Sequence, residues 1–145
     1  MKMLAVVRVR GSVNAKEEVK RTLKYLHLTR PNHCVIVPET PTIKGMLQKV
    51  KDYVTWGEID KETLKKLVKE RGRLKGDRRI PEEKVDEIVK IIMEKGMKEA
   101  GIKVVFRLNP PRKGYERRGV KKPFTVGGAL GYRGKEINNL IERMI

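Results

Sequence analysis

Cysteine and histidine are scarce in this sequence, which has one cysteine, Cys34, and two histidines, His27 and His33. A lone cysteine cannot form a disulfide within the chain, and these three side chains fall short of the four ligands of a structural zinc site. No apolar run approaches the roughly 20 residues of a membrane helix, and charges interrupt the first residues where a signal peptide has its apolar core. We therefore expect a cytoplasmic protein with no metal and no membrane partner.

Acidic residues are also few in comparison with basic ones. The 145 residues include 35 Lys and Arg but 18 Asp and Glu, which gives a formal net charge of +17 at pH 7. Residues 103–135 hold ten basic residues and a single acid, Glu116, and so carry +9. Residues 1–102 hold 24 basic and 15 acidic residues, also +9, in a much longer segment. This imbalance predicts a polyanionic partner such as RNA.

Motifs of catalysis are lacking as well. A phosphate-binding loop has the pattern G-x-x-x-x-G-K-[ST], but after Gly128 the second glycine comes one residue late, and Glu136 stands at the hydroxyl position. His33 and Cys34 are neighbours on an expected strand, where adjacent side chains point to opposite faces. The acidic residues that begin at Glu82 fit the positive end of a helix better than a carboxylate site. We therefore predict a binding protein that is not an enzyme and uses no cofactor.

The first 58 residues have the pattern of strand, helix, strand, helix, strand. Alternation over residues 3–9 predicts the first strand, and short apolar runs at 33–37 and 53–56 predict the other two. Leu23 and Leu26 mark the buried side of the first helix, and Thr40 is the expected N-cap of the second. Two helices on one face of a three-stranded sheet would leave the other face open, with Arg8 and Arg10 at the end of one strand face.

The rest of the chain divides into a helical segment, 59–101, and a basic C-terminal segment, 102–145. Asp60 is placed to cap one middle helix, and Pro81 to begin the next. Residues 103–108 read as a strand, with Lys103 and Arg107 pointing outward, and the apolar spacing after residue 136 predicts a short closing helix that packs back on the core. Two arrangements stay open: the middle helices form an appended subdomain, or the strand near Lys103 returns to the first sheet. The predicted class is α+β.

The main candidate site is the irregular segment 109–134, where glycines, three prolines and basic residues alternate with Tyr115, Phe124 and Tyr132. Glycines permit close backbone approach to a nucleic acid, cations neutralise phosphates and aromatic rings stack on unpaired bases. The alternative is a solvated loop that only keeps the protein soluble, but such a loop would not be so depleted in acids. The basic residues of this segment are Arg112, Lys113, Arg117, Arg118, Lys121, Lys122 and Arg133.

Several segments together resemble the L30 family of large-subunit ribosomal proteins, in its longer archaeal and eukaryotic form. Each segment is weakly specific alone, but their order and spacing cover nearly the whole chain. The segments are residues 7–11, 43–50, 53–58 and 67–72, then 110–112, 127–128, 130–131, 137–138 and 140–141.

The resemblance implies a fold related to the ferredoxin-like class, with a β-α-β-α-β core, a mostly antiparallel sheet, a helical insertion and a basic C-terminal extension. It also implies a structural constituent of the large ribosomal subunit in the cytoplasm, whose partners are large-subunit ribosomal RNA, with 5S rRNA as one candidate, and neighbouring ribosomal proteins. The rival interpretation is an RNA chaperone or regulator outside the ribosome. By resemblance the RNA contacts include Arg8, Arg10, Lys44, Lys49, Arg112, Lys113, Lys121, Lys122 and Arg133, whereas Arg107, Arg117 and Arg118 are assigned from their chemistry alone.

Overall fold

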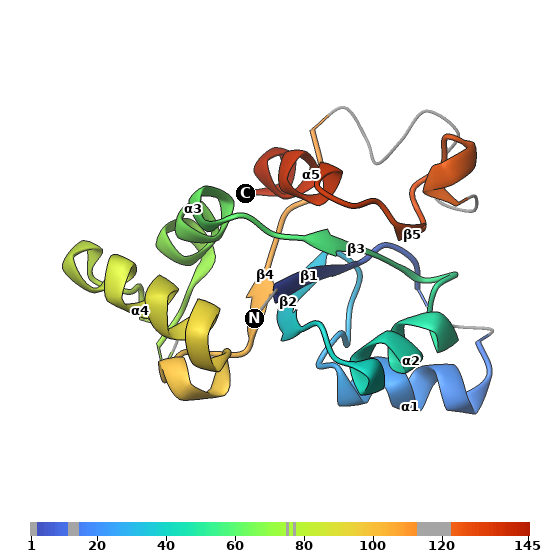
Figure 1. Cartoon of the computed structure of the whole chain (residues 1–145), viewed down its shortest axis with the longest axis horizontal. Helices are drawn as coiled ribbons and strands as arrows, with labels where there is room; N and C mark the ends of the chain where they lie inside the picture. The colour runs from blue at the N-terminus through green and yellow to red at the C-terminus, as the bar shows by residue number, and fades with distance from the viewer. Residues whose placement is uncertain (1–2, 12–14, 75, 77, 113–122) are drawn as a thin grey trace.

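The protein folds around a mixed β-sheet, which has five strands within the residues that the computed structural model describes, namely 3–11, 15–74, 76, 78–112 and 123–145 (Figure 1). Antiparallel pairing joins β1 to β2 and to β3, and β2 to β4, whereas β5 runs parallel to β3. The predicted α+β class and mostly antiparallel sheet are confirmed. The strands are, in chain order, β1 Met3–Arg8, β2 His33–Pro38, β3 Val54–Glu58, β4 Val105–Arg107 and β5 Gly131–Tyr132. Their order across the sheet is β4-β2-β1-β3-β5.

The central strand, β1, is buried on both of its faces. Leu4 and Val6 belong to one hydrophobic cluster, and Met3, Ala5 and Val7 belong to another on the opposite face. A strand that is covered on both faces has a continuous apolar run, because neither set of alternating side chains meets water. The run MLAVV at the start of this strand has that composition.

Two helices, α1 Glu17–Tyr25 and α2 Pro41–Lys49, cover the face that carries Leu4 and Val6. The Oγ1 of Thr40 accepts a hydrogen bond of 3.2 Å from the backbone N–H of Ile43, which confirms the expected cap of α2. Such a cap satisfies one of the backbone donors that a helix leaves unpaired at its start. These helices and the first three strands give the predicted order of strand, helix, strand, helix, strand.

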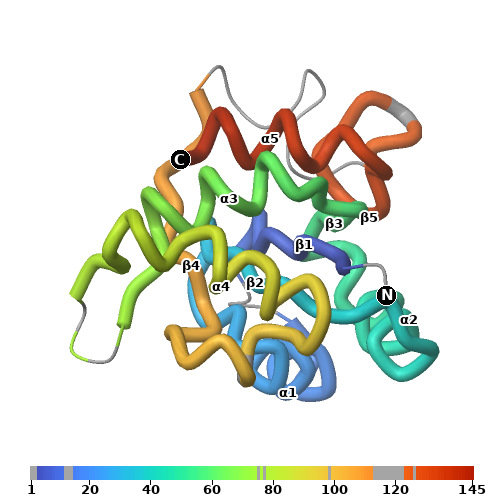
Figure 2. Tube along the Cα trace, turned by 60° about the vertical axis from the view of Figure 1, so that its left-hand side comes forward, coloured from blue at the N-terminus to red at the C-terminus, as the bar shows by residue number. Residues whose placement is uncertain are grey.

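Three further helices, α3 Lys61–Arg71, α4 Glu82–Lys95 and α5 Glu136–Met144, supply the apolar cluster on the other face. Figure 2 shows α3 and α5 on the opposite side of the sheet from α1 and α2. The prediction of an open face is therefore wrong. It considered only the first two helices, whereas the later helices also carry apolar stripes, which become stable by packing on an apolar surface.

The middle helices share one core with the sheet. Leu64 of α3, Ile92 of α4, Phe106 of β4 and Leu140 of α5 are fully buried in the same cluster. Of the two arrangements left open by the sequence, β4 returns to the sheet and pairs with β2. Two short 3-10 helices, η1 Lys98–Ala100 and η2 Phe124–Val126, lie on either side of β4 in the chain. No helix in the described part of the chain is long and apolar enough to cross a membrane.

The start of α5 approaches β3 so closely that one position of the strand has no room for a side chain. A methyl group on Gly57 would overlap the carbonyl oxygen of Gly134. Gly134 itself has a positive φ of 58°, which glycine adopts at little cost. The two glycines therefore let the C-terminal helix dock directly on the sheet.

Candidate nucleic-acid interface

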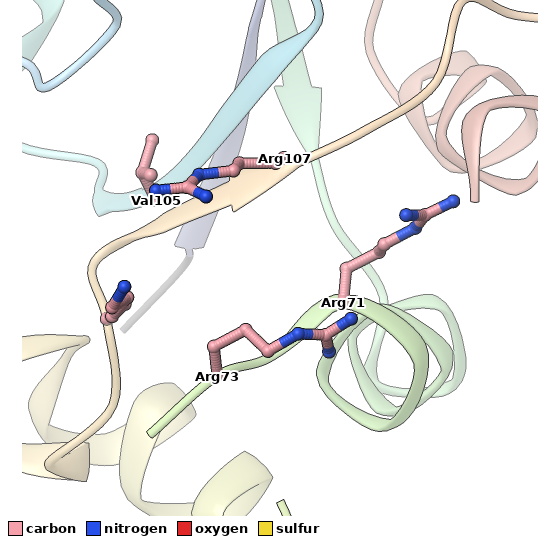
Figure 3. A pocket seen from close by; sticks show the side chains of 5 residues that line it. Arg71, Arg73, Val105 and Arg107 are labelled. Carbon is pink, nitrogen blue, oxygen red and sulfur yellow. The ribbon is translucent and has the colours of Figure 1, made fainter. Parts of the chain in front are cut away.

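The described residues form a basic pocket where the end of α3 meets the edge strand β4. The cavity has a volume of about 240 Å³ and is lined by Arg71, Arg73, Lys103, Val105 and Arg107. Figure 3 shows Arg107 extending along β4, while Arg71 and Arg73 reach from the end of α3 on the other side. We name this cavity the α3–β4 pocket. Four of its five lining residues are cationic, and none of them is acidic.

Backbone geometry brings these distant residues together. Gly72 ends α3, and a methyl group at this position would collide with the carbonyl oxygen of Val68 and the side chain of Ile80. Just beyond it, the carbonyl oxygen of Arg73 accepts a hydrogen bond of 2.9 Å from the backbone N–H of Lys103. This bond links the middle helices to the segment that leads into β4, and it fixes one wall of the pocket.

The guanidinium group of Arg73 is held by backbone oxygens of its own turn. Its Nη1 donates to the carbonyl oxygens of Gly72 at 2.8 Å and Glu70 at 3.2 Å. The carboxylate of Glu70 contacts Arg79, at 3.5 Å. The acid nearest in sequence to Arg73 therefore has another cation as its partner.

His33 reports the positive potential at this edge of the sheet. It pairs with Arg107 across β2 and β4. Burial lowers the pKa of its imidazole, and the charges of Arg107, Arg30 and Arg8 lower the pKa further. Like charges disfavour the protonated imidazole, so the same field favours an anion.

Arg8 is buried and serves the fold. Its side chain is 4% exposed, and its Nη1 donates a hydrogen bond of 2.8 Å to the carbonyl oxygen of Leu28. Its Nε donates to the carbonyl oxygen of Arg10 at 3.0 Å. The expectation that Arg8 lies on an open sheet face is thus wrong, because its side chain is buried and bonded to the turn after α1.

Arg133 is buried to the same degree, at 4% exposure. Its Nε donates to Oγ1 of Thr55 and its Nη2 to the carbonyl oxygen of Ala129, both at 2.8 Å. Its guanidinium lies 4.8 Å from the centre of the Phe124 ring. These contacts join β5 to β3 and to the turn before β5. The structure therefore places the side chain of Arg133 inside the fold, whereas the sequence predicted it as an RNA contact of the irregular segment 109–134.

Three other predicted contacts lie at the surface. Arg10 is partly exposed, donates to the carbonyl oxygen of Asp52 at 3.2 Å and lies 5.3 Å from the centre of the Tyr53 ring. Lys44 and Lys49, on α2, are exposed and form ion pairs with Glu39 at 3.1 Å and Glu18 at 3.0 Å. The Lys49–Glu18 pair is exposed on both sides, and exposed pairs contribute about 0–1 kcal/mol, so a phosphate can compete for Lys49. Lys44 is itself exposed, although Glu39 is partly buried.

Arg112 is the last described residue before the most basic part of the chain. Its backbone N–H donates to the carbonyl oxygen of Arg143 at 3.0 Å, and its Nη2 donates to that of Glu142 at 3.3 Å. On the far side of the basic segment, the backbone N–H of Phe124 donates to the carbonyl oxygen of Leu130 at 2.7 Å. Both flanks are therefore fixed to the folded domain. Lys113, Arg117, Arg118, Lys121 and Lys122, which were predicted from the sequence, lie outside the described residues.

The side chains that could bind a metal do not form a metal site in the described part of the chain. It contains no group of three or more His, Cys, Asp or Glu side chains that could hold a metal ion. Cys34 is fully buried on β2, and burial raises the pKa of its thiol to about 12. A thiol with this pKa stays protonated at neutral pH, so it is neither a nucleophile nor a ligand.

Sequence reasoning missed Arg71 and Arg73 as candidate site residues. Both follow an apolar helical pattern, where basic residues are ordinary partners of the helix dipole. The available signal was the pair of arginines around Gly72, at the point where the helix stops. Their distance in sequence from Arg107 concealed the site, because only the return of β4 to the sheet brings them together.

Comparison with known proteins identifies the family. A family model described as Ribosomal protein L30p/L7e matches residues 4–54. The large ribosomal subunit protein uL30 of Methanococcus maripaludis is 52% identical over 97% of this chain and 98% of its own length. The proteins of the same name from Methanosphaera stadtmanae and Nanoarchaeum equitans are 51% and 46% identical, over 99% and 100% of this chain and the full length of each relative. These relatives confirm the resemblance seen in the sequence, and the chain belongs to the uL30 family of ribosomal proteins.

Proposed function

We propose that this chain is a structural protein of the large ribosomal subunit and that it binds ribosomal RNA by neutralising phosphates. Family membership carries the first part, since full-length relatives at about half identity bear the name of a large-subunit protein. The net charge of +17 supports the second part, because Lys and Arg that contact phosphates release condensed counterions. The chain acts by binding, and the family gives no reason to assign a reaction.

The proposed RNA surface consists of accessible cations that surround the C-terminal half of the fold and α2. Arg8 and Arg133 are left out, because their guanidinium groups bond to the protein backbone in buried positions. In this scheme residues 1–58 are the docking core, 59–101 the helical insertion, and 102–145 the segment that supplies most of the RNA contacts. The proposed contact residues are Arg10, Lys44, Lys49, Arg107 and Arg112, together with Lys113, Arg117, Arg118, Lys121 and Lys122 from the sequence.

The proposed partners are large-subunit ribosomal RNA and neighbouring ribosomal proteins, and 5S rRNA is a finer candidate within the same particle. Sedimentation of the tagged chain with large subunits in high salt tests the assignment. Stable association supports a structural constituent, whereas a chain that stays at the top of the gradient favours a free RNA chaperone or regulator. Crosslinking in intact subunits then decides whether 5S rRNA is among the contacts, since each crosslinked nucleotide can be mapped.

A salt titration tests phosphate neutralisation directly. The logarithm of the affinity for ribosomal RNA should fall linearly with the logarithm of salt concentration, by about 0.7 to 0.9 per neutralised phosphate. An affinity that stays constant across the titration would contradict this mechanism even if the chain remains in the subunit.

A further inference from the structure

We infer that the α3–β4 pocket is a binding site for a single phosphodiester of ribosomal RNA, held jointly by the helical insertion and the edge strand. The inference rests on the proposed function and adds a defined site to it. Arg71 contributes from the end of α3, Arg73 from the turn after it and Arg107 from β4 (Figure 3). Lys103 contributes from the residues that lead into β4. None of these four residues lies in the most basic segment, 113–122.

The chemistry of the pocket fits a phosphate. An arginine guanidinium presents its N–H donors in a planar fork that matches two phosphate oxygens, and three such forks line this cavity. Its volume of about 240 Å³ corresponds to roughly eight water molecules at about 30 Å³ each. That space admits a phosphate group with part of its hydration, but it is too small for a folded protein segment.

The site is organised before the RNA arrives. The Arg73 guanidinium is held by two carbonyl oxygens, and its backbone oxygen is bonded to the N–H of Lys103. Groups that are already fixed lose less conformational freedom when they bind a ligand. A surface lysine on a solvated helix has no such restraint, so the pocket should contribute more to binding than its formal charge alone suggests.

An adjoining groove gives the RNA chain a route away from the pocket. A cavity of about 690 Å³ shares Lys103 and Val105 with it and continues past Ile102, Val104 and residues of the turn after α1. The shared wall is partly apolar, which suits a ribose or base face better than a second phosphate. We therefore expect one phosphate contact at the α3–β4 pocket rather than two.

The test uses the full chain and large-subunit ribosomal RNA of Methanosphaera stadtmanae, with affinity measured across a salt titration. Arg107→Gln is the lead variant, because this side chain is exposed on the edge strand. Its matched control is Arg21→Gln, an exposed arginine on α1 at the opposite face of the sheet. Arg107→Gln should lower the slope of log affinity against log salt by about 0.7 to 0.9, whereas Arg21→Gln should leave the slope unchanged.

A double-variant cycle tests whether one phosphate is shared. If Arg71 and Arg107 hold the same phosphate, Arg71→Gln/Arg107→Gln should lower the slope by about one contact in total. The paired control, Arg21→Gln/Lys24→Gln, removes the same charge elsewhere. Thermal melting of every variant checks the fold, and Arg107→Gln alone keeps the test decisive if the double variant unfolds.

The outcomes separate the two proposals. A wild-type chain whose affinity does not change with salt would overturn the proposed mechanism of RNA binding itself. If the RNA affinity of the wild type depends on salt but the pocket variants have the same slope as the controls, only the proposed phosphate site is overturned. A double variant that loses two contacts would also overturn it, because the arginines would then hold separate phosphates.

Discussion

Replacing Arg133 tests whether one of the two buried predicted RNA contacts is in fact a structural residue. Arg133→Met keeps an unbranched apolar side chain that matches the stem of arginine, but it removes the charge and all of the donors. Two hydrogen bonds of 2.8 Å are lost, to Oγ1 of Thr55 and to the carbonyl oxygen of Ala129. Thr55 retains a partner, because its hydroxyl donates to the carbonyl oxygen of Gly131 at 2.8 Å. The oxygen of Ala129 loses the guanidinium that reached it.

The expected cost follows from these contacts. Hydrogen bonds to a charged group contribute about 1.5–3 kcal/mol each, and the contact with the Phe124 ring adds about 1 kcal/mol. Part of this sum is offset, because a methionine pays no penalty for desolvating a charge. We therefore expect the free energy of unfolding to fall by about 3 kcal/mol, which for a domain of this size lowers Tm by roughly 6–12 °C.

Chemical denaturation and thermal melting measure this cost, with Arg21→Met as a control at an exposed arginine. The control should stay within about 0.5 kcal/mol of the wild type. Arg133→Lys separates charge from geometry, since an ammonium retains the charge but cannot span Thr55 and Ala129 as the guanidinium does. An Arg133→Met variant as stable as Arg21→Met would refute the structural assignment, and so would full rescue by lysine.

Three further perturbations follow from single features of the fold. Cys34, whose thiol has a pKa raised to about 12 by burial, should resist a thiol-reactive dye in the native protein and react on denaturation; rapid native labelling would contradict this placement. His33 has a lowered pKa, so acidification from its unfolded value of 6.5 should destabilise the protein as the unfolded state takes up the proton first, and His33→Gln should weaken this pH dependence of Tm. Gly57→Ala should lower the free energy of unfolding by about 1–3 kcal/mol, because its methyl group would overlap the carbonyl of Gly134; unchanged denaturation would show that α5 can move away freely.

The sequence predicted the elements well where local patterns decide them. Thr40 and Asp60 were expected to cap helices, and each accepts a hydrogen bond from the backbone of its own first turn. Alternation correctly placed Arg107 outside, between the buried Phe106 and Leu108. These features depend on neighbours within a few residues, so no knowledge of the tertiary fold is needed to predict them.

The hydrophobic pattern of the sequence did not predict how the second face of the sheet is covered, because that coverage depends on segments far along the chain. One face of the sheet was expected to be open, because the first 58 residues supply helices for one face only, and the face that α1 and α2 leave uncovered is the Met3 side of β1. Its burial depends on Ile92 and Leu140, which come much later in the chain. Strand periodicity shows that both faces of β1 are apolar, but it does not say which helices will cover them.

The candidate site was predicted in part, for a related reason. Charge density identified Arg107 and Arg112, which the structure leaves exposed. Charge density also selected Arg133, and the family resemblance selected Arg8. Neither signal could distinguish a buried arginine from a surface arginine. The difference lies in backbone carbonyls that accept from the guanidinium, and these are positioned only by the folded chain.

The burial of Arg133 helps to fix one of the two described flanks of the basic segment 113–122. β5 has two residues and pairs with β3 over two positions, too short a strand to hold its place by backbone pairing alone. Arg133 adds bonds to β3 and to Ala129, and so fixes the turn to which the segment after residue 122 returns. Arg112 fixes the other flank on the last turn of α5. The described residues on both sides of segment 113–122 are thus fixed to the folded domain. If segment 113–122 binds phosphates as proposed above, Arg133 contributes to that binding indirectly, through the turn that it fixes.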